Sequence, residues 1–440
     1  MDTGIRLDST LTLFLSLYAL AAAVCLGLYI LNIRHVREHG HEVPDAFTGV
    51  VDQNTLTGMR DYTVATSRLG IIEQSAYDIL LVLLVLIGVF PWITGAVSSL
   101  GMNFIVSGVT FFFLCSLLLG AFEVPFDLYR TFRIEKTFSF STITARVWLT
   151  DLAKSIFVSA LLMGVFLSVF FGLITLAPKS WWLWAWGFFV FFQLLVSWLY
   201  PVVIAPLFNK FEPIEDEDLM AGIRSLAESS GLSIKGIYKM DAMKRSRHSN
   251  AYFTGIGKSK RIVLFDTLLQ DHSHDEILSV LAHELGHWKL GHVRKQLILS
   301  VIISFVLFYG AYLAVTHEGF YTTFGFQTPA IYAGLFLLTL FFKPAAFLLS
   351  PLGAMISRHF ERQADDYAFH QVGTSDALVS ALKKLATLNL SNLHPHPVYA
   401  WFAYSHPPLV ERIRRLKSLG GPGEAAPKAS QLRKSLPKRP

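Results

Sequence analysis

Long runs without a charged residue dominate the hydrophobic pattern of the chain. Five of them cover residues 9–33, 79–122, 155–178, 180–209 and 296–316. A helix that crosses a bilayer needs about 20 apolar residues, so the run 79–122 has room for two spans, which we expect to join near residues 98–101. A last run, 329–350, is interrupted only by Lys343 and Pro344. The pattern predicts an all-α polytopic membrane protein with about seven transmembrane helices.

The segment 205–295 differs from the spans because it mixes helical and strand patterns. Apolar residues recur at helical spacing over 215–229, and short strand patterns occupy 234–238 and 261–265. From His274 the spacing is helical again, and we expect this helix to continue without a break into the sixth span. The segment therefore predicts a small cytoplasmic α+β insertion.

The chain after the seventh span predicts cytoplasmic helices. Helical spacing marks 358–369 and 376–388, and Pro407–Pro408 can start a third helix that ends at Gly420. The remaining residues are rich in Pro, Ala, Ser and basic side chains without periodicity, which is typical of a disordered tail. We therefore expect five regions: 1–204 with five spans, 205–295 as the insertion, 296–350 with two spans, 351–420 as cytoplasmic helices and 421–440 as the basic tail.

Composition indicates a membrane protein, and the distribution of charge predicts its orientation in the membrane. Hydrophobic residues make up 52% of the 440 residues and charged residues 16%, whereas about 25% of residues are charged in soluble domains. Of the 38 Lys and Arg residues, all but Arg6, Lys179 and Lys343 fall on one side of the seven-span arrangement. The positive-inside rule makes that side cytoplasmic, in an endoplasmic reticulum or bacterial inner membrane.

The ends and the cysteines limit the possible partners and ligands. Residues 1–10 lack the basic start of a signal peptide, so we expect the first helix to be retained. The net charge of +6 is explained by topology and by anionic membrane lipid, and no nucleic acid is expected as a partner.

Cys25 and Cys115 both lie inside predicted spans, where we expect two buried small side chains. A metal would then need His and carboxylate ligands.

The candidate chemistry lies in the pentad His283-Glu284-Leu285-Gly286-His287. Residues four apart share a helix face, so both imidazoles can bind one zinc ion, and Glu284 is placed to act as general base on water. The alternative is an amphipathic helix with two surface histidines. The helical pattern and a position next to the membrane, where idle charge is costly, favour the metal site.

A third ligand is needed, because catalytic zinc takes three protein ligands. The metzincin extension would require Gly at position 290 and His at 293, but the chain has Leu290 and Val293. We expect Glu361, on the helix after the seventh span, to complete the set. Asp365 is four residues further on the same face and can accept the outer N–H of a ligand histidine. The alternative for both is a solvated helix face.

Motifs beyond the pentad give the chain its family resemblance. It resembles the type I CaaX prenyl endopeptidases, which are multi-spanning zinc metallopeptidases of the gluzincin kind. The resemblance rests on the pentad and on four further segments, in the family's order: Arg133–Phe138, Ile204–Asn209, Ser249–Phe253 and Ser405–Arg412.

The resemblance implies further site residues. It implies that an edge strand binds extended peptide substrate through its backbone; this strand is Asn250, Ala251, Tyr252 and Phe253. His406 is a candidate donor to the tetrahedral oxyanion, and Arg412 is a candidate to hold a carboxylate, either of the substrate or of the zinc site. The alternative for the strand is a plain turn. The alternative for Arg412 is an ordinary surface arginine. We expect His248, His394 and His396 to be polar surface residues.

The resulting hypothesis is a membrane zinc endopeptidase with one Zn(2+) per chain. By resemblance, it would hydrolyse peptide bonds near the C-terminus of membrane-tethered, prenylated CaaX-type substrates. One alternative is a quality-control zinc protease that clears misfolded membrane proteins. Another is a seven-span transporter or receptor with a degenerate metal site, which Lys343 inside the last span would suit.

Overall fold

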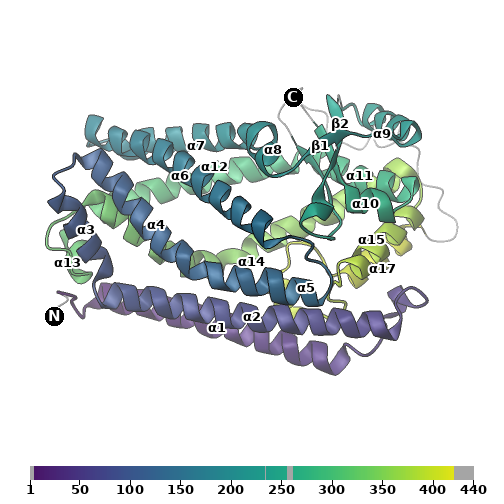
Figure 1. Cartoon of the computed structure of the whole chain (residues 1–440), viewed down its shortest axis with the longest axis horizontal. Coiled ribbons are helices and arrows are strands. Elements are labelled where there is room, and N and C mark those ends of the chain that lie inside the picture. The colour runs from purple at the N-terminus through teal and green to yellow at the C-terminus, as the bar shows by residue number, and fades with distance from the viewer. Residues whose placement is uncertain (1–3, 233, 255–260, 421–440) are drawn as a thin grey trace.

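The computed structural model describes residues 4–232, 234–254 and 261–420, so the predicted tail lies outside the described residues. Seven described helices are long and apolar enough to cross a membrane: Ser9–His39 (α1), Gln53–Leu86 (α2), Phe104–Thr137 (α4 to α5), Ala145–Leu176 (α6), Trp181–Phe208 (α7 to α8), His292–Val315 (α12) and Ile331–Val372 (α14). They run along the long axis of the molecule, and a small sheet with short helices covers one end (Figure 1). The predicted all-α polytopic fold with seven spans is confirmed.

Two of the spans change their helical winding before they end. Helix α4 (Phe104–Tyr129) passes through a π-helical turn, η2 (Arg130–Ile134), into α5 (Glu135–Thr137). Helix α7 (Trp181–Leu199) passes in the same way through η3 (Tyr200–Ile204) into α8 (Ala205–Phe208). Three short elements link other spans: η1 (Asp45–Phe47), α3 (Val89–Ser99) and α13 (Glu318–Thr323).

The second span begins much earlier than the hydropathy pattern predicts. Helix α2 starts at Gln53 and ends at Leu86, so the run 79–122 contains its end, the short α3 and α4. The polar half of α2 is helical because one face packs into a second apolar core outside the bundle. There Leu56 and Met59 meet Leu382 of α15 (Asp376–Leu388) and Ile413 of α17 (Leu409–Leu419). A search for charge-free runs does not detect this half of α2, because it is polar and its apolar face packs against protein.

The insertion is α+β, as predicted. Its four strands are β1 (Phe211–Pro213), β2 (Gly236–Met240), β3 (Ala251–Thr254) and β4 (Arg261–Phe265), in the order β1-β2-β4-β3. Strand β2 is parallel to β4, and the other two pairs are antiparallel. Its helices are α9 (Glu217–Ser229), η4 (Ala242–Lys244), α10 (Asp266–Asp271) and α11 (His274–Lys289).

Two predicted helix boundaries are wrong. Helix α11 does not continue into the sixth span, because Gly291 adopts a φ of 68°, a left-handed conformation that favours glycine, before α12 begins at His292. Conversely, the last span does not end at residue 350. Helix α14 continues through Pro344 and Pro351 to Val372, and so carries the span and Glu361 on one helix. The short α16 (Pro397–Ala403) was not predicted.

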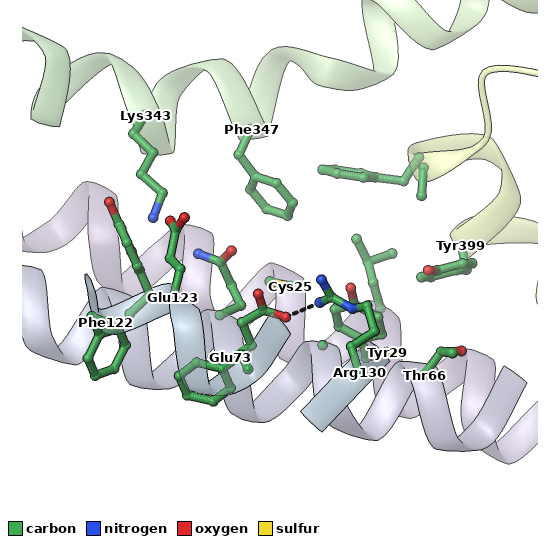
Figure 2. Close-up of a pocket in the computed structure, with 17 residues that line it drawn as sticks. Cys25, Tyr29, Thr66, Glu73, Phe122, Glu123, Arg130, Lys343, Phe347 and Tyr399 are labelled. Atoms are coloured by element: carbon green, nitrogen blue, oxygen red, sulfur yellow. Dashed lines mark hydrogen bonds and ion pairs between the residues drawn. The ribbon is translucent and has the colours of Figure 1, made fainter. Parts of the chain in front are cut away.

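Lys343 has an ion-pair partner inside the bundle. Its Nζ lies 3.1 Å from Asp78 Oδ1 of α2 and 3.6 Å from the centroid of the Tyr77 ring. Lys343 also lines a cavity of about 520 Å³ between α1, α2, α4, α14 and α16, together with Glu73 and Glu123 (Figure 2). An intramembrane lysine is costly without a partner, and the partner explains its place in a span. Cys25 lines the same cavity and is only partly buried, contrary to the prediction, whereas Cys115 is buried.

Candidate active site

Helix α11 holds the pentad and is fixed firmly at its first turn. Ser273 and Glu276 form a reciprocal capping box, in which each side chain accepts a hydrogen bond from the other's backbone N–H. Glu276 also accepts hydrogen bonds from Ser380 and Lys384 of α15 at 2.6 and 2.8 Å. Burial opposes its charge, but these donors lower the pKa of Glu276 to about 2. The charged cap therefore anchors the start of α11 to the C-terminal helices.

The glycine of the pentad allows α11 to approach α14. A Cβ added to Gly286 would lie 3.0 Å from Ala364 Cα and 3.1 Å from Tyr367 Cβ. Two helices pack this closely only where the facing residues are small. Gly286 lies between His283 and His287 in sequence, and Ala364 follows Glu361 by three residues. The glycine thus determines the separation between the two imidazoles and the carboxylate.

We expect Gly286→Ala to lower zinc affinity at least about tenfold, because the added methyl group pushes α14 and Glu361 away. Zinc affinity would be measured by chelator competition on the purified protein. Gly310→Ala on α12 is the matched control, since a Cβ there meets no atom within 4 Å. Equal zinc affinity in both variants would show that the close approach does not matter for the site.

Three side chains from the two helices converge as a candidate metal site. His283 Nε2 lies 3.2 Å from His287 Nε2 and 3.3 Å from Glu361 Oε2, and His287 Nε2 lies 3.2 Å from Glu361 Oε1. Tetrahedral zinc with bonds of 2.0–2.1 Å places its ligand atoms about 3.3 Å apart. Among the described residues, no other group of three or more His, Cys, Asp or Glu side chains brings its ligand atoms within 4.8 Å.

The orientation of these groups also fits a metal. Glu361 is 3% exposed, and its Oε2 is buried without a hydrogen bond of proper geometry. Two imidazole nitrogens that face each other at 3.2 Å need either the N–H of one ring or a metal ion between them. The donor set of two imidazoles and one carboxylate is one that zinc accepts.

Partners outside this set orient both histidines. Asp365 Oδ1 lies 2.8 Å from His283 Nδ1, where the sequence predicts it. His287 Nδ1 lies 3.1 Å from His292 Nδ1, whose Nε2 lies 2.9 Å from Gln363 Oε1. Each ligand histidine therefore has a partner at Nδ1, which leaves Nε2 for the metal.

The sequence assigns no role to His292 or Gln363. His292 lies one residue before position 293, where the metzincin extension would need its histidine. Its ring instead stacks on Phe360, with centroids 4.2 Å apart, and is 1% exposed. The available signal was its place at the start of the sixth span, directly after the break at Gly291.

Arg412 contacts two carboxylates of the candidate metal site. Its Nη2 and Nε donate to Asp365 at 2.6 and 3.0 Å, and Nη1 lies 3.8 Å from Glu361. Burial opposes its charge, but Asp365 and Glu361 raise the pKa of Arg412. Asp365 and Glu361 likewise outweigh the burial of His283 and raise its pKa to about 9. From the sequence, Arg412 could hold a carboxylate of the substrate or one of the metal site. In the structure Arg412 pairs with Asp365 and lies near Glu361.

Glu284 and His406 lie at the open side of the site. Glu284 is half-buried, and no described side chain forms a hydrogen bond or ion pair with its carboxylate. His406 Nδ1 lies 2.8 Å from Glu361 Oε2, and its side chain is 62% exposed. The imidazole of His406 therefore contacts Glu361 while remaining largely exposed, and the carboxylate of Glu284 is partly exposed.

The predicted substrate strand is an edge strand. Strand β3 covers Ala251–Thr254 and pairs with β4 alone, while Asn250 precedes it. Phe253 packs against the apolar cluster that contains Leu285 of α11. Within the described residues the other edge of β3 is unpaired, and β3 contacts α11, the helix that carries the pentad.

The fold and the site together define a multi-pass membrane metallopeptidase. Two family models account for nearly all of the described chain: "CAAX prenyl protease N-terminal, five membrane helices" matches residues 32–210 and "Peptidase family M48" matches residues 213–419. The chain belongs to peptidase family M48, as a member of the CAAX prenyl protease type, and is a metalloendopeptidase. The transporter or receptor hypothesis is therefore wrong.

Curated relatives and a solved structure agree with this assignment. The chain is 35% identical to "CAAX prenyl protease 1 homolog" of Arabidopsis thaliana, over 85% of this chain and 90% of that protein. It is 34% identical to "CAAX prenyl protease 1" of Saccharomyces cerevisiae, over 85% and 88%. It also superimposes on the crystal structure of S. mikatae Ste24p with a TM-score of 0.85 and 32% identity, over 92% of this chain and 99% of that chain.

Proposed function

We propose that this protein is a zinc endopeptidase that cleaves prenylated CaaX-type substrates near their C-terminus, at the cytoplasmic face of the membrane. The observation that carries the proposal is the convergence of His283, His287 and Glu361 beside the unpaired carboxylate of Glu284. The site lies at the end of a seven-span bundle, where a membrane-tethered chain end is within reach.

The residues divide the chemistry between them. His283, His287 and Glu361 would hold a zinc ion, which would supply Lewis-acid chemistry when bound. Glu284 takes the proton of the attacking water and later transfers it to the leaving amine. His406 is exposed beside Glu361 and can donate to the oxyanion of the tetrahedral intermediate. Asp365 and Arg412 keep His283 oriented throughout.

The substrate would bind as an additional strand. An extended peptide pairs its backbone with the free edge of β3, which spans Ala251–Thr254 and follows Asn250. This edge adjoins α11, so the paired peptide would pass close to the pentad. The distribution of Lys and Arg supports a cytoplasmic site in an endoplasmic reticulum or bacterial inner membrane, with lipid as a partner of both protein and substrate.

The test compares matched prenylated and unprenylated CaaX peptides with the purified, zinc-loaded protein. We expect kcat/KM to be at least about tenfold higher for the prenylated peptide, since the lipid contributes apolar burial. Removal of zinc with a chelator should abolish cleavage of both peptides, and added zinc should restore it. Equal turnover of both peptides would favour the quality-control protease instead. Cleavage that survives complete zinc removal would contradict the metal mechanism.

A further inference from the structure

His248 connects three parts of the molecule just before strand β3. Its Nε2 lies 3.2 Å from Glu135 Oε2, on α5 at the end of a membrane span, and its Nδ1 lies 3.0 Å from Asn389 Oδ1, at the end of α15. The ring stacks on Phe140 with centroids 4.1 Å apart and an interplanar angle of 20°. His248 is therefore not the polar surface residue that the sequence predicts.

The hydrogen bonds around His248 require both ring nitrogens to donate. The backbone N–H of Ser249 donates to Asn389 Oδ1 at 3.2 Å, which fixes the amide oxygen toward His248. His248 Nδ1 must then donate to this oxygen, and Nε2 faces a carboxylate. Only the imidazolium has two N–H donors, so the geometry fits a charged His248 paired with Glu135.

Glu135 is itself held in place by a second membrane helix. Its Oε1 accepts a hydrogen bond from Tyr62 of α2 at 2.8 Å. On the other side, the carbonyl of His248 accepts a hydrogen bond from Thr267 at 3.1 Å. The chain then passes through Asn250, whose carbonyl accepts from the backbone of Phe265, into β3. Hydrogen bonds therefore connect two membrane helices to the residues at the start of the edge strand.

We propose that His248 and Glu135 are positioning residues, which hold the start of β3 against the membrane helices so that its free edge stays beside α11. The proposal rests on the proposed binding of substrate to β3. It predicts that the pair affects substrate binding and leaves the chemical step unchanged, because neither residue contacts the candidate metal ligands.

The first test measures kcat and KM for a prenylated CaaX peptide in full-length His248→Gln and Glu135→Gln proteins. We expect KM to rise about tenfold in each, as for loss of a charge-assisted hydrogen bond. We expect kcat and zinc content to stay within about twofold of wild type. The double variant should show little further increase, because both changes break one link. A fall in kcat or zinc content with unchanged KM would overturn the proposal.

A second histidine–carboxylate pair in the insertion serves as the control, because its loss should not affect KM. His274 Nε2, at the start of α11, lies 2.8 Å from Asp216 Oδ2, the N-cap of α9. His274→Gln should leave KM within about twofold of wild type. An equal rise in KM in His274→Gln and His248→Gln would mean that the insertion is merely destabilised, and would overturn the proposal.

A pH profile and a charge-keeping variant separate positioning from folding. Burial alone would lower the pKa of His248, but Glu135 and Asn389 raise it. Glu135 is the charged group that faces the ring, whereas Asn389, Phe140 and Thr267 are neutral. The link is therefore complete where His248 is charged and Glu135 is ionised, and it is lost as pH rises through the pKa of His248, so KM should rise on the alkaline side. His248→Arg should restore a low KM and remove that rise, and an unchanged alkaline rise would contradict the assignment.

Binding measurements distinguish this proposal from the proposed function. Peptide affinity is measured by fluorescence anisotropy on the Glu284→Gln background, with and without His248→Gln, so no cleavage is needed. About tenfold weaker binding with His248→Gln supports the link, and equal affinity overturns it. A peptide N-methylated at the backbone amides that would pair with β3 should bind weakly to both proteins. If wild-type protein fails to cleave CaaX peptides, the proposed function is wrong, whatever this comparison gives.

Discussion

Replacement of Glu284 by Gln is expected to lower kcat about 10³- to 10⁴-fold. The two side chains have the same shape, but the amide of Gln cannot take a proton from water at neutral pH. No described side chain forms a hydrogen bond with Glu284, whose charge acts on Arg412 only through space, so its loss should disturb the fold and the candidate metal ligands little. The measurements are kcat with a prenylated CaaX peptide and the zinc content of the same preparation.

The matched control is Glu228→Gln, an exposed residue at the end of α9. It should retain wild-type kcat and zinc content. If Glu284→Gln keeps more than about a tenth of the wild-type kcat, another group must accept the proton. If it loses zinc as well, Glu284 supports the ligand set, and the rate would no longer report on its role as base.

The sequence predicts the spans because lipid imposes a strict requirement on them. Backbone groups in hydrocarbon must be paired within a helix, and their side chains must be apolar over about 20 residues. The charge-free run 155–178 therefore covers most of α6, Ala145–Leu176, and misses only the polar residues at the start of that helix. The same requirement does not apply to the polar half of α2, which packs against protein through Leu56 and Met59.

The sequence predicts the convergence of the candidate ligands because their geometry follows from helical spacing. His283 and His287 share a face at i and i+4, and without the metzincin extension a third ligand has to come from another helix, where Glu361 lies. Ion pairs between distant elements were harder to predict. Lys343 and Asp78 are 265 residues apart, and His248 and Glu135 are 113 apart, so no local pattern relates them. Such pairs depend on tertiary packing, which spacing along one helix cannot reveal.

Replacement of Asp365 by Ala is expected to destabilise the protein by about 3–5 kcal/mol, because it leaves a buried charge without its partner. Asp365 is 1% exposed and Arg412 is 8% exposed. The same change removes the acceptor of His283 Nδ1, so zinc affinity should fall about 10- to 100-fold. Thermal unfolding in detergent and zinc competition measure the two effects separately. Asp366→Ala is the matched control, since Asp366 pairs with Arg415 of α17 at 2.6 Å but is partly exposed, and it should cost at most about 1 kcal/mol.

A double replacement separates the two roles of Asp365. In Asp365→Leu/Arg412→Met both charges are absent, and apolar residues of similar volume fill their place, so stability should return to within about 1–2 kcal/mol of wild type. Zinc affinity should stay low, because His283 still lacks the acceptor that orients its ring. Recovery of zinc affinity together with stability would mean that Asp365 acts on the metal site only by neutralising Arg412. Low stability in the double variant would instead show that Arg412 stabilises the fold through Glu361, which lies 3.8 Å from its Nη1.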